Sequence, residues 1–340
     1  MGQSIVTLIS GPFPQASIPS LGKIKPFMTV EVDTDGWELH QDELLPYFAM
    51  SDCLVLFPNS KTSTTVWDIK NDRSVGILEG HTNMVVAGAM NTTGSTAVTM
   101  GRDHTPLPYT IKIWSLDTLQ CTANLTSSSD TSSLLKDRLL LGTDHGTIQV
   151  WDIGGSAPVA LMDLEGHDHV VYTIAASDTS NVALSGSNNG SMRLWDLRTG
   201  QCVRVMEEHT HWVNSVSMDS ACLIAVSGAN CDIEGQTAML WDLGSGRCIN
   251  SYNVGSNVHY VTMHESGSSF ITSNGEVFFK AWSNTHGHDD PILNADLSSS
   301  CGSSGCGFDP SVAASRDLSR VGMCCLNKTG SSGLLVSVWK

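Results

Sequence analysis

The sequence predicts an all-β fold, a seven-bladed β-propeller built of four-stranded antiparallel blades. A tryptophan ends a short alternating strand seven times, at an average interval of about 45 residues, which is the length of four short strands with their turns. These tryptophans are Trp67, Trp114, Trp151, Trp195, Trp241, Trp282 and Trp339. The repeat occupies most of the 340 residues, so we expect one closed domain rather than two.

The repeat that begins at Gly166 shows the strands of one blade. The segments VVYTIAAS, NVALSGS, SMRLWDL and QCVRVM follow one another and are separated by short polar turns. Met192 and Leu194 are two residues apart, so strand alternation places them on one face of the sheet. Glycine and asparagine in the turns permit the positive φ of a tight hairpin. Such a sheet is apolar on both faces, and it is therefore stable only between neighbouring blades.

The two ends of the chain predict how the ring closes. No strand follows Trp339, whereas residues 27–32 (FMTVEV) precede the first blade and alternate as a strand does. We expect this N-terminal strand to pair with the last blade, because closure removes an open sheet edge. The propeller would then span residues 27–340, and the proline-containing residues 1–26 would form an N-terminal extension.

The composition narrows the classes of function. The formal net charge of −16 argues against direct contact with nucleic acid and favours a protein or peptide partner, a basic one included. No apolar run approaches the roughly 18 residues of a membrane span, so no membrane insertion is expected. The N-terminus lacks the basic and apolar regions of a secretory signal, so we expect an intracellular, cytoplasmic protein with reduced cysteines.

The succession of GH, SGS, a polar turn and LWD resembles the signature of the WD-repeat β-propeller family, and the resemblance covers essentially the whole chain. It implies that a buried tetrad of His, Ser or Thr, Asp and Trp staples each blade. The matching residues are His81, Thr99, Asp103 and Trp114 in the second blade, His167, Ser185 and Trp195 in the fourth, and His209, Ser227, Asp232 and Trp241 in the fifth. We therefore expect these histidines and acids to be structural and not catalytic.

Only the second blade has all four residues at the expected spacing. In the fourth blade Asn189 occupies the position of the acid, so a charge-assisted bond to the histidine is lost. The third blade has no histidine before its first strand and has His145 at the acid position, while the sixth offers Thr272 and Glu276. The first and seventh blades retain little beyond the tryptophan, so sheet packing must hold them.

The resemblance also implies a partner-binding top face, built from the loop into each first strand and the turn between the second and third strands. On that template its residues are Met84, Val86, Arg102, Asp144, Val170, Tyr172, Asn188, Trp212, Asn214, Asn257 and His259, with Glu43 and Leu45 from the first blade. This mixture of aromatic, apolar and hydrogen-bonding groups is typical of a protein interface. Trp212 is the expected anchor, with capping of the channel as its alternative role. Arg102 could clamp a carboxylate or phosphate, or pair with a neighbouring acid.

Several loops are longer than the repeat predicts or differ from it in composition. Insertions at residues 104–109, 232–236 and 298–310 fall on the top face by their place in the repeat and would enlarge a partner surface. On the opposite face, residues 286–290 (HGHDD) have the composition of a metal cluster, but they lie in one loop, so a solvated turn is favoured. We expect no metal and no cofactor.

The leading hypothesis is a non-catalytic interaction scaffold within a larger intracellular assembly. Residues 195–198 (WDLR) resemble the W-D-x-R box by which some WD-repeat proteins dock onto cullin-type ubiquitin ligases, so Asp196 and Arg198 support an alternative role as a substrate receptor. A propeller enzyme would need side chains converging on the channel, for which His259 and Asp144 are the candidates. No phosphate-binding loop, HExxH or nucleophile elbow is present, so no enzyme is expected. Binding of RNA is disfavoured by the charge.

Overall fold

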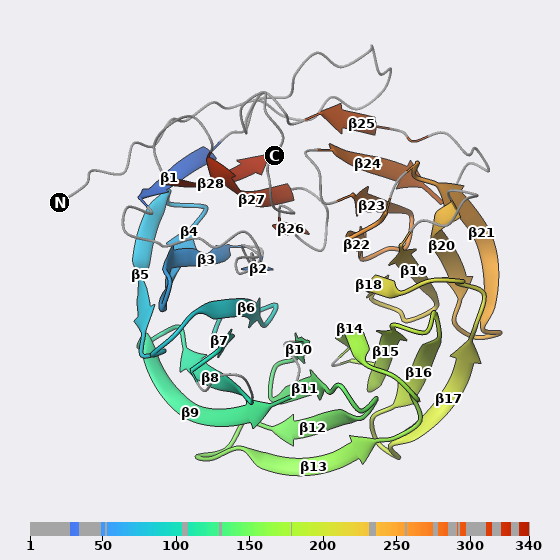
Figure 1. The fold of residues 1–340 in the computed structure, drawn as a ribbon, viewed down its shortest axis with the longest axis horizontal. Helices are drawn as coiled ribbons and strands as arrows, with labels where there is room; N and C mark the ends of the chain where they lie inside the picture. The colour runs from blue at the N-terminus through green and yellow to red at the C-terminus, as the bar shows by residue number, and fades with distance from the viewer. Residues whose placement is uncertain are drawn as a thin grey trace.

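The computed structural model describes residues 28–33, 49–51, 53–103, 108–128, 131–177, 179–230, 236–255, 257–274, 278–284, 291, 293–296, 311–314, 321–327 and 333–339. These residues form seven four-stranded antiparallel sheets arranged as the blades of a ring (Figure 1). The N-terminal extension predicted for residues 1–26 and the loops at 286–290 and 298–310 lie outside the described residues. So do Glu43, Leu45, Asp232 and Glu276.

Each of the first six blades is a meander of consecutive strands that runs from the central axis outward. Blade 1 comprises β2 (Ala49–Met50), β3 (Leu54–Ser60), β4 (Ser63–Asp68) and β5 (Arg73–Glu79). Blade 2 comprises β6 (Val85–Met90), β7 (Thr96–Gly101), β8 (Tyr109–Ser115) and β9 (Gln120–Ser127). Blade 3 comprises β10 (Ser132–Leu134), β11 (Arg138–Gly142), β12 (Ile148–Asp152) and β13 (Val159–Leu164).

Blades 4 to 6 repeat this arrangement. Blade 4 comprises β14 (Val171–Ser177), β15 (Val182–Ser187), β16 (Met192–Asp196) and β17 (Gln201–Met206). Blade 5 comprises β18 (Val213–Met218), β19 (Ile224–Ala229), β20 (Gln236–Asp242) and β21 (Arg247–Asn253). Blade 6 comprises β22 (Tyr260–Met263), β23 (Ser269–Ser273), β24 (Phe278–Ser283) and β25 (Leu293–Asp296).

The seventh blade combines both ends of the chain. Its strand order is β1-β28-β27-β26, with β1 at Met28–Asp33, β26 at Ser311–Ala314, β27 at Val321–Asn327 and β28 at Gly333–Trp339. The N-terminal strand β1 pairs antiparallel with β28, from Met28 opposite Val338 to Asp33 opposite Gly333. The inner strand β26 contacts both β22 and β2, so blade 7 joins blade 6 to blade 1.

The repeated tryptophans pack between neighbouring blades. Trp114 packs with Leu56, Val66 and Leu78 of blade 1, and Trp195 packs in the same way on blade 3. Trp241 packs on blade 4 and Trp282 on blade 5. In each of blades 1 to 5 a β-bulge directly precedes this tryptophan, which increases the local twist. In blades 2, 4, 5 and 6 the tryptophan therefore completes the apolar core that the preceding blade begins.

Candidate interaction site on the top face

The top face is the end of the propeller where each outer strand leads into the inner strand of the next blade, and where the second strand turns into the third. Backbone hydrogen bonds tie these two loops together within a blade. They run from Arg102 N to Met84 O (2.8 Å), from Asn188 N to Val170 O (3.2 Å) and from Asn230 N to Trp212 O (3.1 Å). Side chains from both loops therefore reach one continuous surface.

Residues of blades 4, 5 and 6 line a shallow, open pocket on this face. Its volume is about 390 Å³, and its lining residues are Tyr172, Trp212, Asn214, Asn230, Asn257 and His259. Trp212 and Tyr172 are 49% and 38% exposed, so both rings are accessible to a partner. Their ring centroids are 5.7 Å apart, with the planes tilted by 56°. The structure thus brings together five of the residues that the sequence placed on the top face.

Asn230 belongs to this pocket, although the sequence analysis did not select it. Asn214 Nδ2 donates to Asn230 Oδ1 (2.6 Å) and to Val258 O (3.0 Å), which links blade 5 to the loop that enters blade 6. In the other blades the top-face residue of this turn is the one just before the acid position. In blade 5 that rule misses Asn230, because the insertion at residues 232–236 lengthens the turn. Counting three residues forward from Ser227 finds it, since the same count from Ser185 reaches Asn188.

The loops around the pocket are acidic. Glu165 and Asp168 precede Tyr172, and Glu207 and Glu208 precede Trp212; all four acids are exposed. Five basic residues lie between positions 165 and 282, all of them on strands or on the turn after β16: Arg193, Arg198, Arg204, Arg247 and Lys280. Two of them approach these loops from the strands, because the charge of Arg193 acts on His167 and Lys280 Nζ donates to Val254 O (2.7 Å). The loops before Tyr172 and Trp212 therefore carry exposed acids and no basic residue of their own, which favours a cationic partner.

Three of the expected top-face residues are less exposed to a binding partner than the sequence suggested. Met84 is buried, with 3% of its surface exposed, so its selection as a partner-binding residue is wrong. The cause is local, because Asp103 Oδ1 accepts hydrogen bonds from the backbone N–H groups of Thr82 (2.7 Å) and Asn83 (3.0 Å) and holds this loop inward. Val170 and Arg102 are half-buried.

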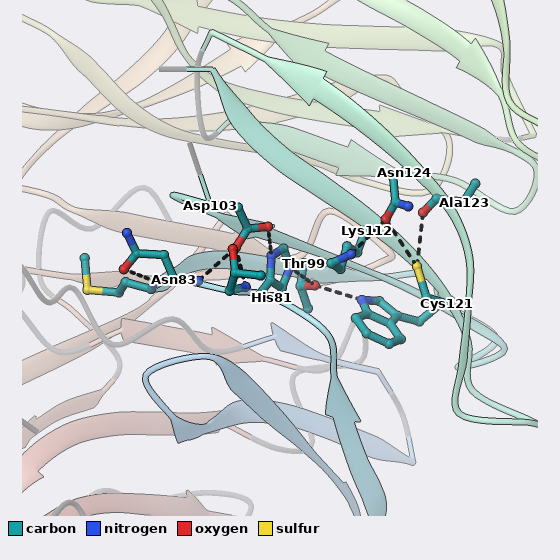
Figure 2. Close-up of polar contacts among 11 residues, drawn as sticks. His81, Asn83, Thr99, Asp103, Lys112, Cys121, Ala123 and Asn124 are labelled. Atoms are coloured by element: carbon teal, nitrogen blue, oxygen red, sulfur yellow. Dashed lines mark hydrogen bonds and ion pairs between the residues drawn. The ribbon is translucent and has the colours of Figure 1, made fainter. Parts of the chain in front are cut away.

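Blade 2 contains the complete hydrogen-bonded tetrad (Figure 2). Trp114 Nε1 donates to Thr99 Oγ1 (2.8 Å), and His81 joins Thr99 Oγ1 through Nε2 (2.8 Å) and Asp103 Oδ2 through Nδ1 (2.8 Å). The side chains of His81 and Asp103 are only 2% and 7% exposed. This geometry fits the structural role that the sequence predicts for the pair.

Blades 4, 5 and 6 keep parts of the tetrad. In blade 4, Ser185 joins Trp195 Nε1 (2.9 Å) to His167 Nε2 (2.7 Å), while His167 Nδ1 bonds Ser191 Oγ (3.2 Å) in place of an acid. Ser191 in turn donates to Asn189 Oδ1 (2.7 Å), so two short polar residues replace the carboxylate. Blade 5 retains the bonds of Ser227 to Trp241 and His209, and blade 6 retains that of Thr272 to Trp282.

Blades 1 and 3 have lost the hydroxyl itself. In blades 2, 4, 5 and 6 the hydroxyl residue of the tetrad pairs across the sheet with the residue two positions before the tryptophan. The same position is occupied by Leu141 in blade 3 and by Phe57 in blade 1. Accordingly, the buried Nε1 atoms of Trp151 and Trp67 have no hydrogen-bond partner.

Burial sets the protonation state of the tetrad histidines. It lowers the pKa of both His167 and His209 to about 4, and the charge of Arg193 adds to the effect at His167. Burial also lowers the pKa of His81, against the opposing influence of Asp103. The pKa of the Asp103 carboxyl is raised by burial, but hydrogen bonds from His81, Asn83 and Thr82 outweigh this and bring it below its ordinary value. The histidines therefore make their hydrogen bonds to the tetrad hydroxyls as neutral rings.

Other features offer little chemistry. The inner strands of blades 1 to 6 line a central cavity of about 340 Å³ with mostly small, hydroxyl and methionine side chains. In the described ranges no three His, Cys, Asp or Glu side chains are grouped to hold a metal ion. Nor does this part of the chain contain a helix long and apolar enough to cross a membrane. His259 lines the top pocket, whereas Asp144 belongs to blade 3 and is not among the residues that line it.

Comparison with known proteins agrees with the blades and their tetrads. The family described as "WD domain, G-beta repeat" matches residues 159–196 and 200–242, two segments that each end one residue after the tryptophan of blade 4 or blade 5. These two segments are WD repeats. One chain in a crystal structure of the mitotic checkpoint complex shares this WD-repeat propeller's fold, with a TM-score of 0.73 over 96% of this chain and 98% of that one, at 14% identity.

Curated relatives match only parts of this WD-repeat chain. The nuclear distribution protein PAC1 of Arthroderma otae is 27% identical over 229 residues, which cover 56% of this chain and 47% of the relative. The probable coatomer subunit beta' of Schizosaccharomyces pombe is 30% identical over 159 residues, 45% of this chain and 18% of the relative. The chain thus spans less than half the length of these relatives. Their likeness supports a protein-interaction scaffold of the WD-repeat type.

Proposed function

We propose that this WD-repeat chain is a non-catalytic subunit of a larger intracellular assembly and binds a basic segment of a partner protein at the top-face pocket. The observation that carries the proposal is the exposed aromatic pair, Trp212 and Tyr172, in a pocket whose surrounding loops carry acids and no lysine or arginine. Exposed tryptophan in a pocket is the commonest kind of interface anchor, worth about 2 kcal/mol or more of binding free energy. One similar protein is a probable coatomer subunit, and a protein of the same fold belongs to the mitotic checkpoint complex. Both support an assembly role for this chain.

Affinity purification of the tagged full chain, quantified by mass spectrometry, tests this proposal. Trp212→Ala should remove the principal partner, and raising the salt concentration should weaken its capture, because the loops around the pocket contribute electrostatic attraction. The matched control is Ile249→Ala, which also truncates an apolar side chain that is about half exposed (52%) but lies on the outer strand β21. Equal partner sets for the two variants would refute top-face binding.

A second candidate, docking onto a ubiquitin-ligase adaptor, rests on Arg198. Its guanidinium lies 3.4 Å from Asp196, but its side chain is 73% exposed and available to a partner. It lies on the turn between β16 and β17, at the end of β16 opposite the top face. The two surfaces could therefore act together, with the adaptor at one end and the substrate at the other. Loss of adaptor capture by Arg198→Ala, with Trp212→Ala unchanged, would establish this role.

A further inference from the structure

Two acceptor oxygens on the top face, outside the set of residues that line the pocket, have no hydrogen-bond partner. Backbone hydrogen bonds place their turns beside Tyr172, from Asn188 N to Val170 O (3.2 Å) and from Val171 N to Thr143 O (3.2 Å). Asn188 and Asp144 occupy matching positions in blades 4 and 3, three residues after Ser185 and Leu141 respectively. The Oδ1 atom of each is buried and unpaired. A buried polar atom without a partner costs about 1–3 kcal/mol, so a ligand that satisfied it would recover that cost.

Comparison with blade 5 explains why Asn188 lacks a donor. There the equivalent residue, Asn230, accepts a hydrogen bond from Asn214 Nδ2 (2.6 Å). In blade 4 the position of Asn214 is taken by Tyr172, five residues after the tetrad histidine. An aromatic ring offers a face to stack on but no amide donor. One substitution within the repeat thus both creates the aromatic pair and leaves the acceptor beside it unsatisfied.

The aromatic pair and the acids select for a cation. A cation over the face of tryptophan or tyrosine is attracted by the ring quadrupole, most strongly when partly desolvated. The exposed acid Asp168, in the loop before Tyr172, adds to this attraction. A quaternary ammonium would satisfy the rings but has no N–H for the oxygens. A lysine ammonium has donors but no plane with which to stack.

We propose that the top face captures an arginine side chain of its partner. The planar guanidinium stacks on Trp212 and Tyr172, and its five N–H donors reach the side-chain oxygens of Asn188 and Asp144 once these turn toward it. The inference rests on the proposed function but is narrower, since it specifies the group that is recognised and assigns acceptor roles to Asn188 and Asp144.

Binding of small probes, measured by saturation-transfer NMR on the full chain, tests the arginine pocket. The probes are Nα-acetyl-argininamide, the neutral isostere Nα-acetyl-citrullinamide, and the acetylated amides of lysine and trimethyl-lysine. They are used up to about 10 mM, because one side chain contributes little affinity. Arginine should bind at least about tenfold more tightly than each of the others. Equal or tighter binding of trimethyl-lysine, or no binding of argininamide, would overturn the inference.

Variants identify the groups responsible. Asn188→Ala should weaken argininamide several-fold while leaving trimethyl-lysine binding unchanged. Asp144→Ala removes a charge as well as an acceptor, so it should weaken argininamide more than trimethyl-lysine, whereas Trp212→Ala should weaken both. Asp242→Ala, at the exposed end of β20 opposite the top face, is the control for net charge, and it should change neither. If the probes fail but Trp212→Ala still releases the natural partner, the arginine inference is wrong and top-face docking stands. If the partner is also retained, both are wrong.

Discussion

At the scale of the residue, the hydroxyl of the tetrad matters more than its acid. Thr99 Oγ1 joins Trp114 Nε1 and His81 Nε2, and removing it would leave both buried nitrogens without a partner. Thr99→Val keeps the shape of the side chain, so the expected loss is mainly that of the hydrogen bonds. We expect the free energy of unfolding to fall by at least about 2 kcal/mol, measured by urea denaturation. Thr126→Val, at an exposed position in the same blade, should cost far less, and equal losses would contradict this view.

The neutral histidines predict acid sensitivity. The pKa of His167 and of His209 is 6.5 in the unfolded chain and about 4 in the folded protein. The unfolded state therefore binds these protons first, so stability is greatest above about pH 6.5 and declines as the pH falls toward 4. Each histidine accounts for about 3 kcal/mol of this decline. In urea denaturation between pH 7 and pH 4.5, His167→Gln should show a shallower decline than the unmodified chain. Parallel curves would contradict the assignment.

At the scale of the element, the sequence predicted the blades well and the state of individual tetrads less well. The strands before Trp114, Trp195 and Trp241 follow directly from alternation and spacing, because a strand has a fixed period of two. The loss of the hydroxyl at Leu141 was missed, since it depends on cross-strand register. The burial of Met84 depends on how Asp103 holds its loop, which no spacing rule conveys. The pocket residues were found because the repeat places them equivalently in each blade.

Blade 3 offers a test of the lost hydroxyl. Leu141→Thr would supply an acceptor for Trp151 Nε1 but would remove apolar contacts from a fully buried site. A new hydrogen bond contributes about 1 kcal/mol, whereas burial of a leucine contributes about 2 kcal/mol, so we expect net destabilisation. Leu139→Thr, in the same cluster and equally buried, loses the contacts without the bond. It should be the more destabilising of the two by about 1 kcal/mol in urea denaturation. The opposite order would show that the indole does not use the new hydroxyl.

At the scale of the whole molecule, closure of the ring depends on the pairing of β1 with β28. The six pairs from Met28–Val338 to Asp33–Gly333 cover the outer side of β28, which would otherwise be an open edge. Deleting residues 1–33 removes this strand, so we expect a lower and less cooperative thermal transition, with aggregation on heating. Deleting only residues 1–26 leaves β1 in place and serves as the matched control. That shorter deletion should melt as the full chain does. If both deletions melt alike, β1 does not contribute to closure; if both are equally damaged, residues 1–26 are part of the propeller and not an extension of it.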